Sequence, residues 1–387
     1  MSITHKRGSD MDVKKYVIAL SLFALVNTAV FATTAEGEEA YNQEHYEKAY
    51  MLLSPEAEKG DAKAQYLIGK MYYNAQGVTF SPEKTEKWLL ASANQGNADA
   101  EVLLAAFYWY QNTPEGFSKA FTWYQKAANQ NNAEGQYGLG YMYDTGSGVP
   151  QSYETALIWY KKAAALGNSN AALAIGYDYD MGIGVEQNKT EAVTWYDKAA
   201  TLGNISAQYN LGLMYEQGDG VTQDYNKAAQ YFEQAANKDH AKAQLELGYL
   251  YDSGKLGTQN LQKASYWYQK SADLGNMYAQ YNIADMYFYG EGLSKNLQQS
   301  VTWMQKAASQ GYPKAQNQLA VYYRDGIGLG ADPVLAYAWF STALNHGYTK
   351  ATANLSSLEK TLSAEELMKG KLLAEQYTID YKSKDEH

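Results

Sequence analysis

Residues 133–168 read AEGQYGLGYMYDTGSGVPQSYETALIWYKKAAALGN, and this stretch predicts two helices around a glycine-rich centre. The first helix is expected from Glu134 to Tyr143. Within it Leu139 and Tyr143 stand four residues apart, so they share one helical face. Gly140 lies beside Leu139 and leaves a position without a side chain, where a neighbouring helix can approach closely.

The second half of the same stretch predicts another helix after a sharp turn. Gly146 and Gly148 end the first helix, because glycine adopts the left-handed capping conformation without steric cost. The second helix is expected from about Ser152 to Leu166. Its inward stripe combines aromatic and small side chains at helical spacing, namely Ala156, Trp159, Tyr160, Ala163 and Ala164. The stretch therefore encodes a helical hairpin.

The hairpin recurs along the chain with a period of 36 residues. Gly140 begins a column that continues at the same spacing through Gly176, Gly212, Gly248, Ala284 and Ala320. A second column is aromatic and holds seven of the eight tryptophans, in the series Trp88, Trp123, Trp159, Trp195, Tyr231, Trp267, Trp303 and Trp339. Periods of this length are typical of solenoids. We therefore expect an all-α, right-handed superhelical solenoid of stacked antiparallel hairpins, built as one elongated domain.

The repeated phrase A-x-x-x-L-G-x-x-Y-x-x-G-x-G-V, followed by K-A-x-x-W-Y-x-K-A-A-x-x-G, resembles the Sel-one-like repeat family, which is related to the tetratricopeptide repeats. The resemblance covers residues 62–348 in eight copies, which begin at Ala62, Ala98, Ala133, Ser169, Ile205, Ala241, Met277 and Pro313. The second copy departs from the pattern, because it lacks the glycine turn. The family implies a noncatalytic adaptor that binds proteins.

The ends of the array are expected to differ from the repeats, since terminal copies must cap the core. Residues 33–61 are interpreted as an N-terminal capping hairpin whose second helix is interrupted at Pro55. Residues 349–387 are interpreted as C-terminal capping helices with a polar tail. There Ser363 and Glu366 form a predicted capping box that starts a last helix through about Tyr377.

Residues 1–32 resemble a secretory signal peptide. Lys14 and Lys15 precede an apolar run, and a small residue, Ala32, stands at the expected cleavage point, with Ala35 as the alternative. A retained membrane anchor is the competing interpretation, but polar residues interrupt the run before it reaches the ~20 residues that a spanning helix needs. Met11 is a second candidate start. We expect an exported protein, periplasmic or secreted, without stable membrane insertion.

Composition narrows the partner class. The chain carries 42 acidic and 32 basic residues, a formal charge of −10, and after the predicted signal peptide its sole arginine is Arg324. Nucleic acid is therefore excluded as a partner, because phosphate binding needs clustered lysine and arginine. The chain has no cysteine, so it has neither disulfides nor a lipid-modified cysteine.

No arrangement of residues predicts catalysis. The histidines that follow the signal peptide are scattered and lie near helix ends or the terminus: His45, His240, His346 and His387. The glycine turns follow helices rather than strands, so helix capping explains them better than phosphate binding does. Asp178 and Asp180 are two apart on a helix and point to different faces. We expect no catalytic residue, no cofactor and no metal.

Tyrosine is the remaining unusual feature, with 37 copies in the chain. One tyrosine column is interpreted as core: Tyr72, Tyr108, Tyr143, Tyr179, Tyr215, Tyr251, Tyr287 and Tyr323. The position after the Gly/Ala column varies instead, as a ligand surface does, and predicts a concave binding groove at Tyr141, Tyr177, Leu213, Tyr249 and Asp285. Polar residues three positions earlier, Asn210, Glu246 and Asn282, join this groove, since amides can grip a peptide backbone.

Trp109 and Tyr110 in the irregular second copy are further candidates, because Trp109 stands outside the tryptophan column. Tyrosine and tryptophan offer large, rigid contact area, which suits an interface. The alternatives are that the tyrosines are a tolerant solvent face and that Trp109 only fills space left by the missing turn.

Three functions compete at this stage. The first is an exported scaffold that binds a protein segment, with peptidoglycan as a second candidate ligand, in envelope assembly or signalling. The second is a host-directed entry or virulence factor that binds eukaryotic proteins. The third is a weak beta-lactamase activity, which the resemblance suggests through cysteine-rich relatives. The absence of cysteine and of a serine–lysine catalytic arrangement argues against it.

Overall fold

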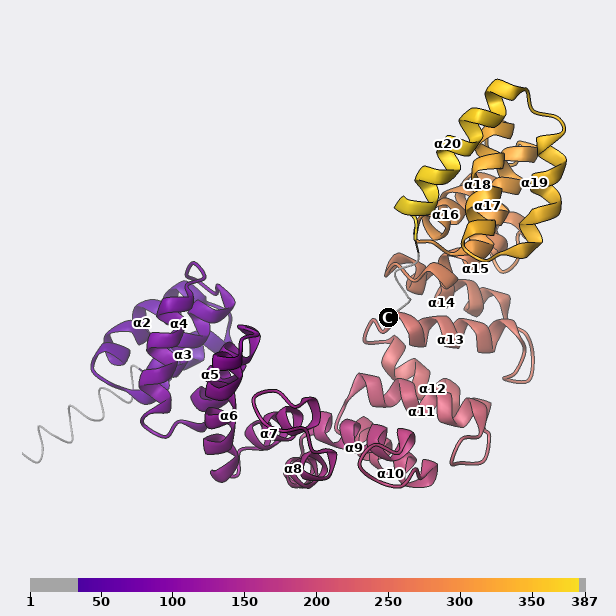
Figure 1. Ribbon diagram of the computed structural model, residues 1–387. Helices are drawn as coiled ribbons and strands as arrows, with labels where there is room; N and C mark the ends of the chain where they lie inside the picture. Colours follow the sequence, from indigo (N-terminus) through magenta and orange to yellow (C-terminus); the bar gives the residue numbers. More distant parts are fainter. Residues whose placement is uncertain (1–33, 383–387) are drawn as a thin grey trace, which may run out of the picture. The chain divides into compact units, whose positions relative to one another are not determined.

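The computed structural model describes residues 34–382, and every regular element in that range is helical (Figure 1). The predicted signal peptide and the last five residues lie outside the described residues. The all-α class is therefore confirmed. Within each of the two compact units described below, the helices pair into hairpins, formed by a first and a second helix that are neighbours in sequence.

The first helices start where each copy of the repeat begins. They are α3 (Ala62–Asn74), α5 (Ala98–Tyr110), α7 (Ala133–Thr145), α9 (Ser169–Met181), α11 (Ile205–Gln217), α13 (Ala241–Asp252), α15 (Met277–Tyr289) and α17 (Pro313–Asp325). The second helices are α4 (Pro82–Ala93), α6 (Pro114–Asn129), α8 (Tyr153–Ala165), α10 (Lys189–Thr201), α12 (Tyr225–Ala236), α14 (Leu261–Asp273), α16 (Leu297–Ser309) and α18 (Pro333–Asn345).

Side-chain caps fix the helix ends. An asparagine before most first helices accepts a hydrogen bond from a backbone N–H of the first turn, as Asn132 does from Gly135 at 2.9 Å. His240 takes this place before α13, where its Nδ1 accepts from the Ala243 amide at 3.1 Å. The glycine turn also behaves as predicted, because Gly146 ends α7 in the left-handed conformation at φ 70°.

The glycine column makes room for a ring from the second helix of the same repeat. A Cβ on Gly140 would lie 2.7 Å from Cδ1 of Tyr160, and one on Gly248 would lie 2.6 Å from Cδ1 of Tyr268. Such distances are shorter than any carbon contact allows, so an alanine here would force the ring to move. The predicted close approach is confirmed, and the approaching group is an aromatic side chain.

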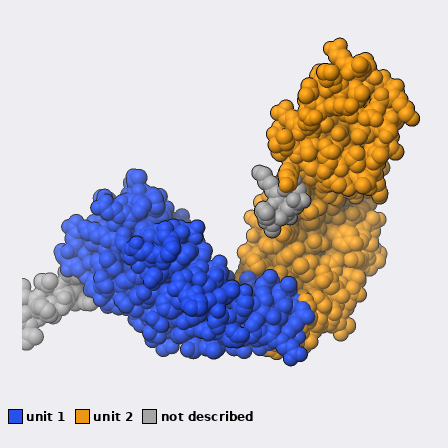
Figure 2. All heavy atoms as spheres, in the orientation of Figure 1, with its two compact units in different colours: residues 1–187 blue, residues 188–387 orange. Residues whose placement is uncertain are grey.

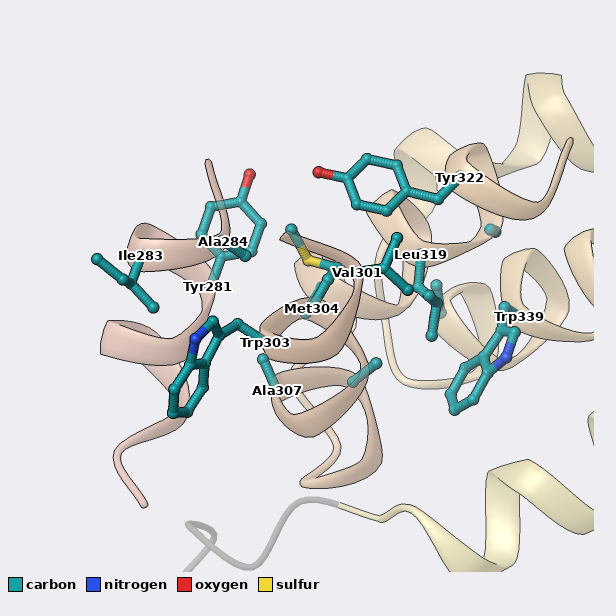
Figure 3. Packing of buried hydrophobic residues seen from close by; sticks show 14 of the residues in the cluster. Tyr281, Ile283, Ala284, Val301, Trp303, Met304, Ala307, Leu319, Tyr322 and Trp339 are labelled. Carbon is teal, nitrogen blue, oxygen red and sulfur yellow. The ribbon is translucent and has the colours of Figure 1, made fainter. Parts of the chain in front are cut away.

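The tryptophan column is buried in four repeats, at Trp123, Trp267, Trp303 and Trp339, and half-buried in three others. Trp303 is buried (Figure 3), whereas Trp159 and Trp195 are half-buried, with a lysine Nζ 3.8 Å from the Trp159 ring centre. The deepest second-helix residue is the next one along, and it is almost fully buried in seven repeats: Leu89, Tyr160, Tyr196, Phe232, Tyr268, Met304 and Phe340. A helix rotates by about 100° per residue, and this rotation places the second of two adjacent residues toward the first helix.

The tyrosine column that was expected in the core is also only partly buried. Tyr72 and Tyr108 are buried, but the remaining six members are half-buried. Their phenol groups reach the rim of the core, where lysine side chains cover several rings, as Lys263 does for Tyr251 at 4.8 Å. The hydroxyl explains this placement, because it needs a polar partner or water.

The chain divides into two compact units, residues 1–187 and residues 188–387, here called unit 1 and unit 2 (Figure 2). Each unit has its own hydrophobic clusters. In unit 2 the largest cluster joins the second helices α14, α16 and α18 to the first helices α15 and α17, and Figure 3 shows its central part around Met304.

The caps at the two ends depart from the repeats. Residues 34–42 and α2 (Tyr46–Glu58) form the first hairpin, and α2 continues through Pro55, so the predicted interruption there is wrong. The proline removes one hydrogen bond, to the carbonyl of Met51. Because Met51 is strongly exposed, water can replace that bond.

The chain ends in η1 (Thr349–Ala351), α19 (Thr352–Glu359) and α20 (Ala364–Asp380). The predicted capping box is present, since Glu366 N donates to Ser363 Oγ at 3.3 Å and Ser363 N donates to Glu366 Oε2 at 2.9 Å. α20 lies along α18, where Tyr377 and Tyr381 pack on Trp339 at ring-centre distances of 4.7 and 5.3 Å. These aromatic contacts close the core.

Candidate functional site

The position that follows the glycine column faces outward in several first helices. Tyr141, Tyr177 and Tyr249 have exposed fractions of 36%, 49% and 44%. Single exposed aromatic side chains are common on protein surfaces. Exposure alone therefore does not distinguish a binding surface from a tolerant one, and the surroundings of each residue matter.

In unit 1 the structure brings three of the predicted residues together around one cavity. Trp109 lies with its ring centre 5.3 Å from that of Tyr110 and 5.7 Å from that of Tyr141, both in edge-on contact. The cavity is about 430 Å³, and we call it the aromatic hollow. Its lining residues come from α5, α6 and α7: Val102, Ala106, Trp109, Tyr110, Tyr124, Glu134, Tyr137, Gly138 and Tyr141.

The floor of the aromatic hollow depends on one glycine. Any side chain at Gly138 would collide with the ring of Tyr124, so the ring lies flat against the α7 backbone only because Gly138 lacks a Cβ. Burial raises the pKa of the phenol groups of Tyr124 and Tyr137, so both remain neutral hydrogen-bonding groups. At the rim Glu134 accepts a hydrogen bond from Asn168 Nδ2 at 2.9 Å.

Trp109 also carries an unpaired donor. Its indole Nε1 is buried and has no hydrogen-bond partner among the described residues. Buried N–H groups are rarely left in this state. The tryptophan lines a cavity between two exposed tyrosines, in the repeat that lacks the glycine turn.

A second hollow adjoins the first and shares Tyr110 with it. It is about 520 Å³ and is lined by Tyr73, Phe80, Pro82, Phe107, Tyr110 and Gln111. Tyr110 is 68% exposed and belongs to the lining of both hollows, and Phe80 is also strongly exposed. Unit 1 therefore presents two neighbouring aromatic hollows on one surface.

The predicted groove residues of unit 2 lie in different surroundings. Leu213, Asn210 and Asn282 are half-buried rather than open to solvent. Asp285 is half-buried too, and burial raises the pKa of its carboxyl group, while Tyr281 donates a hydrogen bond to it. Half-burial is compatible with lining a groove, so the place of these residues in a binding groove stays a prediction.

Glu246 lines a larger cavity of about 770 Å³ in unit 2, together with Tyr209, Leu245, Tyr278 and Tyr381. Burial raises the pKa of Glu246 to about 7, and the charge of Glu216 adds to the shift. Lys255 opposes it only weakly, since its Nζ is bound to Glu216 at 3.0 Å and lies over the Tyr249 ring at 4.7 Å. Lys242, Lys382 and Asp380 also line this cavity, so its lining holds two basic and two acidic residues.

Two sets of residues were missed by the sequence analysis. Asp178 is buried in a column that otherwise holds apolar residues, and burial raises its pKa to about 7. A glutamine near the start of six first helices is buried as well: Gln65, Gln136, Gln208, Gln244, Gln280 and Gln316. Both were visible in the 36-residue register, one as a break in an apolar column and the other as a repeated polar residue.

Neither metal binding nor membrane spanning finds support in residues 34–382. In this range no three histidine, cysteine, aspartate or glutamate side chains gather as a metal site requires. None of the helices described combines the length and the hydropathy needed to cross a bilayer.

The family model of the Sel1 repeat matches the chain in eight consecutive segments, residues 62–97, 98–132, 133–168, 169–204, 205–240, 241–276, 278–312 and 313–348. The chain belongs to the Sel1 repeat family. The matched segments start at the residues expected from the sequence, except that the seventh starts one residue later. Sel1 repeat proteins are typically noncatalytic scaffolds that mediate protein–protein interaction, and nothing in the comparisons indicates catalysis.

Two solved Sel1 repeat structures resemble the chain over most of its length. A protective antigen of uropathogenic Escherichia coli strains, which displays an SLR fold, is 30% identical with a TM-score of 0.57, covering 93% of this chain and 95% of its own. A Sel1 repeat protein from Oxalobacter formigenes is 28% identical with a TM-score of 0.60, covering 85% and 93%. These neighbours confirm the α-solenoid fold.

Curated relatives share only part of their length with this Sel1 repeat protein. An ERAD-associated E3 ubiquitin-protein ligase component of Arabidopsis thaliana is 32% identical over 125 residues, which is 29% of this chain and 18% of that protein. Chitin synthase regulatory factor 3 of Schizosaccharomyces pombe is 31% identical over 109 residues, 27% of this chain and 12% of its own. The chain thus spans less than a fifth of either relative.

Proposed function

We propose that this Sel1 repeat protein is an exported, noncatalytic scaffold in which the aromatic hollow of unit 1 holds a segment of a protein partner. The observation that carries the proposal is the meeting of Trp109, Tyr110 and Tyr141 around one cavity beside an unpaired indole donor. Exposed tryptophan and tyrosine are typical of the residues that dominate binding energy at protein interfaces.

The partner is proposed to act in the cell envelope, in assembly or signalling. A protein partner is preferred over peptidoglycan because the scaffolds of this family bind proteins. Export rests on the signal-like residues 1–32. If they are removed, the protein recovered from the periplasm begins at Thr33, and N-terminal mass analysis tests this directly. Recovery of an uncleaved chain would contradict export by this route.

One observation favours the host-directed alternative. The solved structure that this chain resembles over most of its length is described as a protective antigen present in uropathogenic Escherichia coli strains. A scaffold of the same family in this role would meet eukaryotic proteins. The alternative uses the same hollow and differs only in the partner.

The test compares binding by three forms of the purified protein. Wild type, the double variant Tyr110→Ala with Tyr141→Ala, and a control with Tyr266→Ala and Tyr289→Ala are each used to capture proteins from envelope extract and from host-cell lysate. The control removes two tyrosines that are also exposed, Tyr266 at 54% and Tyr289 at 63%, but lie outside the hollow.

The proposal expects a partner from the envelope that the control retains and the hollow variant loses. A partner captured from host lysate with the same pattern of loss favours the entry or virulence role. Equal capture by both variants would refute the hollow as the binding surface, even if a partner is found.

A further inference from the structure

A buried glutamine near the start of six first helices holds a fixed orientation. In six first helices its side-chain Nε2 donates to the backbone carbonyl eight residues earlier, as Gln136 does to Ala128 at 3.4 Å and Gln280 does to Ala272 at 3.2 Å. This bond decides which end of the amide is the nitrogen. The side-chain oxygen, Oε1, therefore faces away from that carbonyl and needs a donor of its own.

At three junctions the chain supplies the donor from the position 30 residues later. Gln95 Nε2 donates to Gln65 Oε1 at 2.8 Å and Gln310 Nε2 donates to Gln280 Oε1 at 2.7 Å, while the third partner is His346, whose Nδ1 lies 3.0 Å from Gln316 Oε1 and whose Nε2 lies 3.1 Å from the Thr378 carbonyl. Two of these donors are carboxamides. The chain itself shows which chemical group fits the position.

At three other junctions the oxygen has no partner in the described part of the chain, namely at Gln136, Gln208 and Gln244. The residues 30 positions after these three glutamines are Leu166, Lys238 and Leu274. Leucine has no donor. Lys238 has one but bonds to the Gly203 carbonyl at 3.3 Å and leaves Gln208 Oε1 unpaired. The ammonium group of Lys238 therefore does not pair with the Gln208 oxygen, and this favours a neutral amide as the ligand.

Gln136 lines an open cavity of about 420 Å³. The glutamine is only 3% exposed. The half-buried ring of Trp159 and the side chain of Leu166 form apolar walls, and Asn129 and Asn131 complete the rim. Lys162 holds its Nζ 3.8 Å from the Trp159 ring centre, so this wall is positively charged and disfavours a cation.

We infer that this cavity is a binding site for the side-chain carboxamide of a glutamine or asparagine presented by a partner protein, here called the amide site. The ligand N–H donates to Gln136 Oε1, and its methylene groups lie against Trp159 and Leu166. The ligand takes the place that Gln95 and Gln310 occupy at other junctions. The amide site shares no residue with the aromatic hollow, so the inference stands independently of the proposed function.

The test uses N-acetylglutamine N-methylamide as the probe and the full exported protein labelled with nitrogen-15. The side-chain amide signal of Gln136 and the indole signal of Trp159 report binding by NMR. Capped norleucine has a side chain of the same length without an amide group, and the side chain of capped lysine ends in an ammonium group. We expect both to bind about 2- to 10-fold more weakly than the glutamine probe, as the loss of one neutral hydrogen bond implies.

A self-filling variant separates the amide site from unspecific contact. In the Leu166→Gln variant the new side chain should donate a hydrogen bond to Gln136 Oε1 and abolish binding of the glutamine probe. The Leu166→Met variant should bind the probe as tightly as wild type does. Leu166 is 51% exposed, so neither change threatens folding. Equal shifts with norleucine, continued binding by Leu166→Gln, or no shift with any probe would each overturn the inference.

Discussion

Replacing Asp178 by asparagine should stabilise this protein at neutral and alkaline pH. Asp178 is 6% exposed, and its column is otherwise apolar: Met71, Phe107, Met142, Met214, Leu250, Met286 and Tyr322. Burial is the main cause that raises its pKa from 3.8 to about 7, and the nearby charge of Asp144 adds to it. The folded protein therefore bears the cost of a buried carboxylate whenever Asp178 is ionised.

The magnitude follows from the size of the pKa shift. Each pKa unit corresponds to about 1.4 kcal/mol, so the shift is worth up to about 4 kcal/mol. The sign is fixed because the folded pKa is higher than the unfolded pKa. Below pH 3.8 both states hold the proton and the penalty vanishes; it grows as the pH rises and is complete above pH 7.

The assay is urea unfolding followed by circular dichroism at several pH values between 4 and 8. The difference in unfolding free energy between Asp178→Asn and wild type should grow by about 2 to 4 kcal/mol across this range. For the control Asp239→Asn, a change at an exposed turn, the unfolding free energy should vary with pH as it does for wild type. Parallel curves for Asp178→Asn and wild type would refute the argument, since they would mean that Asp178 is solvated.

Four further substitutions test the packing. Phe232→Ala should lower the unfolding free energy by about 3 to 5 kcal/mol and Trp195→Ala by less, because Phe232 is fully buried and Trp195 is not; equal losses in urea unfolding would contradict this depth order. Gly248→Ala should cost about 1 to 3 kcal/mol through collision with Tyr268, and an unchanged melting temperature would disprove the close contact. Gln310→Leu should cost about 1 to 3 kcal/mol, because it leaves a buried glutamine oxygen at the adjacent junction unpaired; an unaltered urea midpoint would weaken the premise of the amide site.

The sequence alone determined the repeat architecture of this protein. A 36-residue period, a glycine column and paired apolar stripes identify the hairpins, since helical periodicity and capping are local properties that a short stretch expresses by itself. The capping box at Ser363 and the left-handed glycine at Gly146 follow for the same reason, and both are present. Trp109 and Tyr110 could be singled out because they break the register.

Tertiary structure decided how deep each side chain lies and which polar atoms find partners. The sequence placed Trp195 and Tyr251 in the core, but their ring edges and polar groups turn toward its rim. The apolar column that Asp178 interrupts indicates its burial, but no pattern in the sequence reveals the unpaired oxygen of Gln136, because that depends on side chains that neighbouring helices supply. Burial and hydrogen bonding are set by contacts between residues about one repeat apart, and those contacts exist only after the hairpins have stacked.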